Sequence, residues 1–276
     1  MKRQVFLLVF FVLSTLLVNA QIQEDDEVGT RGSFLSTRPS VTSTVKSTKS
    51  TKSTKSTTKT TKPKTSSNSN VGIGYTLYLK GKDENPVRVS PAQEFKEGDA
   101  IRLVFEPNVD GYLYVFHTEN DKDPTMIFPD ARLKRGDNLV QAHVPYEVPA
   151  SDDADDSLRW FVFDEKSATE KLYVVLSKTP LTEVPSSEQL VRYCEQKLCP
   201  WQPTEKLWQD ISSKANQNVK VSKNAKDQGQ AQSEGEKRSI KALKALEKKA
   251  ASPTVIYLSR SVELNQIVTP ISLVHK

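Results

Sequence analysis

The chain has 276 residues, with 39 Lys and Arg against 34 Asp and Glu, and this length fits one large domain or two small ones. The charge is segregated: residues 36–70 hold seven Lys, one Arg and no acid, residues 71–185 hold 13 basic and 21 acidic residues, and residues 186–276 hold 15 basic and nine acidic residues. Because only the flanks of an acidic central part are basic, the composition argues against a nucleic-acid partner.

The first twenty residues predict a secretory signal peptide, residues 1–20. Lys2 and Arg3 precede an apolar run from Val5 to Val18, and small residues lead to Ala20. This run of about fourteen residues is shorter than the roughly twenty that a membrane span needs, which favours a cleaved signal peptide. A retained membrane anchor is the alternative. We expect cleavage after Ala20, export to the periplasm, cell surface or extracellular space, and no transmembrane span after cleavage.

Residues 21–70 are predicted to be a disordered, low-complexity linker rich in Ser, Thr and Lys. Its central part, residues 46–67, reads KSTKSTKSTKSTTKTTKPKTSS and has no aromatic or acidic residue and no Val, Leu or Ile. Such a segment cannot bury enough apolar surface to offset its ordering entropy. Three interpretations remain: a solvated spacer, a glycosylated segment, or a flexible cationic tether with weak attraction to anionic lipid or wall polymer.

From Val71 onward the sequence alternates between apolar and polar residues. Predicted strands, separated by turn residues, lie at 75–79, 101–105, 112–116, 126–128, 139–144, 160–163 and 172–176. Short β-rich runs at this spacing predict a mainly β protein. We expect an antiparallel, Ig-like β-sandwich.

After Pro185 the hydrophobic period becomes helical. Residues 186–250 are predicted to form a helical insertion, in which Ser186 and Thr204 cap the first two helices, residues 220–236 form a mobile loop and residues 237–250 form a third helix. Strands follow at 255–258 and 267–274. These last strands have no nearby partner, so we expect them to return to the sandwich and make residues 71–276 one domain.

No residue is assigned a catalytic, cofactor-binding or metal-binding role. His117, His143 and His275 lie in no recognised catalytic motif, and His117 is expected to be a solvent-exposed residue at a strand end. The acidic runs 119–123 and 152–156 offer oxygen atoms to Ca²⁺, but neither has the spacing of an EF-hand loop, and solvated loops are the simpler interpretation.

Cys194 and Cys199 are the only thiols. An even number of cysteines in an exported chain favours a disulfide between them. A continuous helix would hold their Cα atoms roughly 8–9 Å apart, so we expect the helix to end or tighten before Cys199. A redox or metal pair is less favoured, because the spacing is not that of thioredoxin-like sites and no other Cys completes a zinc site.

The stretches VDGYLYVFHTENDKDPTMIFPDARLKRGDNLVQAHVPYEVP and WFVFDEKSATEKLYVVLSKTPL resemble a bacterial family, domain-of-unknown-function family 4384, over about residues 73–185. The similar elements lie at 111–116, 127–129, 136–138, 145–149 and 170–181. Ser167 and Ala168 depart from the family, which tends to have Gly ahead of the Thr-Glu pair. The resemblance implies a β-rich, non-catalytic accessory module of the kind found beside caspase-like peptidases and kinases, and it supplies no catalytic residues.

These observations predict an exported, non-enzymatic binding or accessory module that needs no cofactor and whose partner is an unknown protein or envelope polymer. The alternatives are a structural cell-envelope protein that grips anionic polymer, and a hydrolase without a recognised motif. A hydrolase requires a pocket with convergent acids or a His–acid pair. A binding module requires an exposed apolar or aromatic patch.

Overall fold

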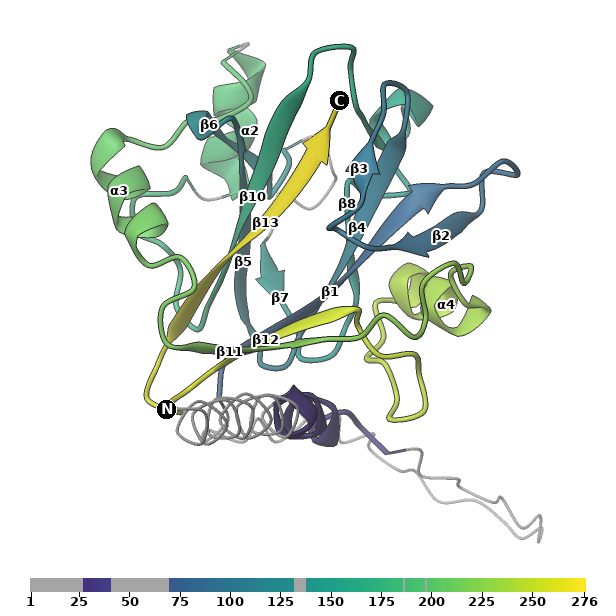
Figure 1. Ribbon diagram of the computed structural model, residues 1–276. Coiled ribbons are helices and arrows are strands. Elements are labelled where there is room, and N and C mark those ends of the chain that lie inside the picture. The colour runs from purple at the N-terminus through teal and green to yellow at the C-terminus, as the bar shows by residue number, and fades with distance from the viewer. Residues whose placement is uncertain (1–26, 41–69, 132–137, 186, 197) are drawn as a thin grey trace, which may run out of the picture.

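The alternating runs form the strands of a β-sandwich in the computed structural model, which describes residues 27–40, 70–131, 138–185, 187–196 and 198–276 (Figure 1). Sheet A has the strand order β11 (Val219–Lys223), β12 (Val255–Ser259), β1 (Gly72–Lys80), β4 (Ala100–Pro107) and β8 (Tyr146–Val148), with β2 (Pro86–Val89) on β1 and β9 (Phe161–Val162) on β4. Sheet B has the order β3 (Glu94–Phe95), β13 (Gln266–His275), β10 (Ala168–Ser177), β5 (Gly111–Glu119) and β6 (Lys122–Phe128), with β7 (Leu139–Val140) on β5.

The predicted mainly β, antiparallel sandwich is confirmed, with one parallel exception. The long pairs β1–β4, β5–β10 and β10–β13 are all antiparallel. Among the strands in the described residues, only the two-residue strand β3 runs parallel to its neighbour, the end of β13. The returning strands are also confirmed, because β12 lies between β11 and β1 in sheet A and β13 lies between β3 and β10 in sheet B.

The main core lies between the two sheets. Because side chains alternate along a strand, every second residue of each strand faces this core. The inner face of sheet A contributes Ile73, Tyr75, Leu77, Ile101, Leu103 and Phe105, and that of sheet B contributes Leu113, Val115, Leu172, Val174, Leu176 and Ile271. Burial of these side chains is the main favourable contribution to folding.

Helices cover the outer faces of both sheets. Helices α2 (Ser187–Glu195) and α3 (Glu205–Ser213) pack Leu190, Leu207 and Ile211 against the outer side chains of sheet B, and Figure 1 shows α3 beside β5, β10 and β13. On sheet A, the N-terminal helical residues 27–36 and α4 (Glu234–Ala242) lie outside β12 and β2. None of the helices in the described ranges is long and apolar enough to cross a membrane.

The prediction of a disordered linker is wrong for residues 27–40. This segment, hereafter the N-terminal arm, forms a helix over 27–36 and packs Phe34 against Ile256 and Leu258 on the outer face of β12. Gly72 leaves the room for Phe34, because a Cβ there would lie 3.2 Å from the Phe34 ring and 2.7 Å from Leu258. Residues 1–26 and 41–69, which hold the predicted signal peptide and the Lys-rich tract, lie outside the described residues.

The predicted helical insertion differs from the structure in three places. The expected mobile loop 220–236 contains most of β11, which pairs with β12, and the start of α4. Helix α4 begins at Glu234 rather than residue 237, because Ser233 and Glu236 form a capping box. It ends at Ala242 rather than 250, because Leu243 adopts a left-handed conformation (φ 47°).

One predicted strand of the sandwich is also shorter than expected. The strand predicted at 139–144 covers only Leu139–Val140.

Candidate functional site

A cavity of about 260 Å³ lies between the sheets, where β5, β10 and β13 reach the end of the sandwich. Its walls are mostly apolar, with Ile101, Ile127, Phe161, Leu172 and Leu273 among them. The polar side chains that line it are His117, Glu119, Asp164, Glu170 and His275. We call this space the end cavity.

The strand period places these polar side chains inside the sandwich. His117 follows the core residue Val115 by two positions on β5, and Glu170 precedes the core residue Leu172 by two positions on β10. His275 follows Leu273 in the same way on β13. Because β10 lies between the other two strands, its Glu170 has a histidine on either side.

The two histidines share the carboxylate of Glu170. His117 Nε2 donates a short hydrogen bond to Glu170 Oε2. His275 Nδ1 lies 3.8 Å from the other carboxylate oxygen, Oε1. The side chain of His275 is 3% exposed, that of Glu170 16% and that of His117 34%, so the cluster is closed at His275 and open toward solvent at His117.

The backbone carbonyl of Lys166 fixes the tautomer of His275. His275 Nε2 is hydrogen-bonded to this oxygen, which can only accept, so Nε2 carries the proton. In the neutral ring Nδ1 is therefore an acceptor. Among the described residues this buried nitrogen has no hydrogen-bond partner. The ring is held in place by Phe163, whose centroid lies 4.9 Å away.

A groove of about 480 Å³ lies next to the end cavity and shares Ile127 and Phe161 with it as a common wall. The groove runs between β6, the end of β8, the short helix η1 (Asp156–Leu158) and the end of α2. Apolar and aromatic side chains dominate its lining, with Met126, Phe128, Val148, Trp160, Leu190 and Trp201 among them.

Two contacts fix the aromatic side of this groove. The backbone N–H of Met126 donates to the carbonyl of Trp201 at 2.8 Å, which holds the segment after α2 against the edge of β6. The guanidinium of Arg102 lies 4.0 Å from the centre of the Trp160 ring. Burial lowers the pKa of Arg102 from its ordinary value, and the nearby carboxylate of Glu147 opposes this shift.

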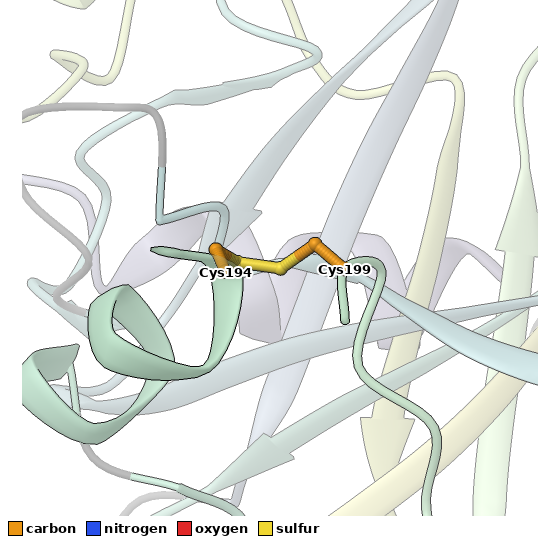
Figure 2. Close-up of a disulfide and its surroundings, with 2 residues drawn as sticks. All are labelled: Cys194 and Cys199. Carbon is orange, nitrogen blue, oxygen red and sulfur yellow. A yellow bond between two sulfur atoms is a disulfide. The ribbon is translucent and has the colours of Figure 1, made fainter. Parts of the chain in front are cut away.

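Cys194 and Cys199 line the groove and are joined in a disulfide, with Cα atoms 4.8 Å apart (Figure 2). Figure 2 shows Cys194 at the end of α2 and Cys199 on the loop that follows. Helix α2 ends at Glu195, as the expected pairing requires. The bond closes the loop that leads to Trp201, so it supports the wall of the groove and has no other thiol beside it in the described residues.

The remaining residues that the sequence analysis considered have local roles. His143 is buried in the turn between β7 and β8, where its Nδ1 is 2.7 Å from Glu106. In the acidic runs, Asp121 pairs with Lys171 and Asp155 accepts from the backbone N–H of Ser157. Within the described ranges no group of three His, Cys, Asp or Glu side chains is placed to hold a metal ion.

The cluster of the end cavity was not predicted from the sequence. His117 was expected to be solvent-exposed, yet it is half-buried on the inner face and bonded to Glu170. One signal was available: each of these polar residues lies two positions from a core residue on its strand. That signal identifies an inward-facing polar side chain, but it does not say which strands are neighbours.

Comparisons with known proteins identify one family. No curated protein and no solved structure matches the chain. Residues 94–180, which carry β5, β6 and β10 and thus His117 and Glu170, match the family described as Domain of unknown function (DUF4384), the family that the sequence resembles.

Proposed function

We propose that this protein is an exported, non-enzymatic binding or accessory module whose partner is an unknown protein or envelope polymer. The observation that carries the proposal is the common wall of Ile127 and Phe161, which makes one continuous binding surface from the aromatic groove and the end cavity. An apolar groove with a few convergent polar groups is the usual form of a ligand site. The apolar patch expected of a binding module is therefore this groove, because helices cover the outer faces of both sheets.

A second candidate is a hydrolase, which the His117–Glu170 pair in the end cavity favours. A histidine oriented by a carboxylate can act as a general base toward water. However, none of the described residues that line the end cavity is a Ser, Thr or Cys. A nucleophilic mechanism through a hydroxyl or thiol has no side chain available there, and we therefore favour binding over catalysis.

The test is sedimentation of the mature protein, residues 21–276, with isolated bacterial cell wall and with envelope vesicles. Ile127→Lys places a charge in both the cavity and the groove. The matched control is Val191→Lys, on an exposed part of α2 that lines neither space. We expect Ile127→Lys to lose at least about tenfold in affinity and the control to bind like the wild type. Equal binding by both variants contradicts the proposal.

The same samples separate binding from hydrolysis. A binding module releases no soluble fragment from the cell wall over hours. If the wild type releases soluble fragments, and Glu170→Gln releases none although it still sediments with the cell wall, the protein is a hydrolase instead. Export is tested by the mass of the protein isolated from its native cells, which should begin at Gln21.

A further inference from the structure

We propose that the end cavity binds a primary ammonium group at the end of an unbranched aliphatic chain. This inference rests on the proposed binding function and names the chemistry of one part of that surface. It starts from the buried Nδ1 of His275, which lines the cavity and has no partner among the described residues. A buried acceptor without a donor is unfavourable, so this position favours a ligand that donates.

The neighbour of this nitrogen is also an acceptor. Glu170 Oε2 receives the hydrogen bond of His117, and Oε1 lies 3.8 Å from His275 Nδ1. Two acceptors at this separation can both be reached by one donor atom at about 2.9 Å from each. A primary ammonium has three N–H groups, enough for both acceptors and for one more.

The charge of the cavity selects a cation. Glu119, Asp164 and Glu170 all line it. Lys166 pairs with Glu119 at 2.6 Å, and this pair is largely exposed to solvent. Among the described residues that line the cavity there is no Lys or Arg. A carboxylate or phosphate ligand is therefore disfavoured, and a neutral apolar ligand would leave the acceptors buried without a donor.

The apolar walls and the volume of the cavity favour a short, unbranched aliphatic stem next to the ammonium group. Ile127, Leu172 and Leu273 offer apolar surface in the same cavity as the polar cluster, and the volume of about 260 Å³ admits a short chain but leaves little room for a bulky head. Burial of methylene groups against apolar side chains is favourable, so a butyl stem fits this surface. The side chain of a lysine on a partner has this form, and an amino sugar offers the same ammonium without the stem.

The experiment follows the imidazole resonances of the mature, untagged protein by NMR during titration with n-butylammonium, in the presence of a chelator. The controls are butyltrimethylammonium, which has the charge but no N–H, and n-butanol, which has the stem but no charge. We expect n-butylammonium to shift the resonances of His275 and His117 with a Kd of about 1 mM, at least about tenfold tighter than either control. Glucosamine should bind more weakly than n-butylammonium.

Glu170→Gln should weaken n-butylammonium binding at least about tenfold. Its matched control is Glu94→Gln, because Glu94 pairs with Lys276 on the exposed surface near the same end of β13 and lines neither space. Should Glu170→Gln fail to fold, as judged by its melting transition, His275→Phe removes the acceptor and keeps a ring, and it should weaken binding as well.

Equal affinity for n-butylammonium and n-butanol would overturn the proposal, because it would show that the cavity binds the apolar stem and does not recognise the ammonium group. Unchanged binding in Glu170→Gln would also overturn it, as would Zn²⁺ alone shifting both histidines, in a sample without chelator, when no amine does. Failure of the amine titration together with Ile127-dependent sedimentation would refute this inference and leave the binding function standing. The reverse result would refute the binding function and leave the ammonium site.

Discussion

The guanidinium of Arg38 is fully buried and is bonded to the carboxylate of Glu106, with Nε 2.8 Å from Oε1 and Nη2 2.6 Å from Oε2. It also donates to the carbonyl oxygens of Ala250 and Ala251 at 2.8 and 3.0 Å. Arg38 thus joins the N-terminal arm to β4 and to the segment before β12. Because both charges lie away from water, each depends on the other.

We predict that Arg38→Met lowers the free energy of unfolding by about 3–5 kcal/mol, because it leaves the buried charge of Glu106 without the guanidinium and with only His143 Nδ1 beside it. The double variant Arg38→Met, Glu106→Gln should recover part of this loss, since no lone charge remains. Urea denaturation gives the values. Lys237→Met is the control, because its pair with Glu234 is exposed and should contribute less than about 0.5 kcal/mol. An Arg38→Met variant as stable as this control contradicts the prediction.

The buried phenol of Tyr75 makes the free energy of unfolding depend on pH in the alkaline range. Burial, with a smaller effect of Tyr257, raises the pKa of Tyr75 above its ordinary value of 10.0. Because the folded-state pKa exceeds the unfolded one, the stability from this neutral phenol is complete below about pH 10 and is lost as the pH rises further. We predict that, between about pH 10 and pH 11.5, the free energy of unfolding falls by about 2 kcal/mol less in Tyr75→Phe than in the wild type. Denaturation curves at several pH values check this, and a constant difference between the two proteins over that interval contradicts it.

At the scale of elements, the N-terminal arm behaves as a bound helix rather than as part of a linker. Phe34 is buried against Ile256 and Leu258, and Thr37 Oγ1 lies 2.8 Å from His143 Nε2. The backbone N–H of Lys248 donates to the carbonyl of Pro39 at 3.2 Å. These contacts and the Arg38–Glu106 pair hold the arm along its whole length.

We therefore predict that the arm stays on the domain after the chain is cut between residues 41 and 69. A recognition sequence for a specific protease inserted there allows the cut, and size-exclusion chromatography with mass spectrometry shows whether the two parts elute together. In Phe34→Ala the arm should be released, because about 3–5 kcal/mol of packing is lost. Separation of the wild-type arm with no change in melting temperature would show that the arm adds nothing to stability.

At the scale of the whole molecule, the docked arm limits the distance that the Lys-rich tract can reach from the domain. Residues 41–69 connect residue 40, which follows the Pro39–Lys248 contact, to Asn70, which donates to the carbonyl of Ser259 at the end of β12. A fully extended chain of 29 residues spans at most about 100 Å, so a loop fixed at both ends reaches at most about 50 Å from the domain. The contacts on either side of the tract therefore limit how far its lysines can reach from the domain.

We predict that replacing the seven Lys of residues 46–64 by Gln leaves the melting temperature unchanged, because loop length and all buried contacts stay the same. Binding to vesicles that contain phosphatidylglycerol should weaken at low salt, and the difference should shrink near 0.15 M salt, where the Debye length is about 8 Å. Vesicles of phosphatidylcholine alone are the control. Equal binding of both proteins to the anionic vesicles at low salt would make the tract a plain spacer.

Most of the strands, the sandwich and the match to a family could be predicted from the sequence alone. Short runs between Val71 and Pro185 alternate with period two, and a sheet built from them must bury its apolar face against another layer, which here is a second sheet. The spacing of Cys194 and Cys199 before Pro200 likewise indicated where α2 ends. These features depend on neighbours in the chain, so local rules were sufficient.

The end cavity and the docking of the N-terminal arm could not be predicted from the sequence, because both depend on contacts between distant segments. His117, Glu170 and His275 lie 53 and 105 residues apart, and they meet because β10 pairs with β5 on one side and with β13 on the other, a strand order that no local pattern encodes. The arm contains two glycines and three serines and has weak intrinsic helix propensity. Its helix is held by the burial of Phe34 and by the pairing of Arg38 with a carboxylate 68 residues away, so its conformation follows from packing rather than from its own sequence.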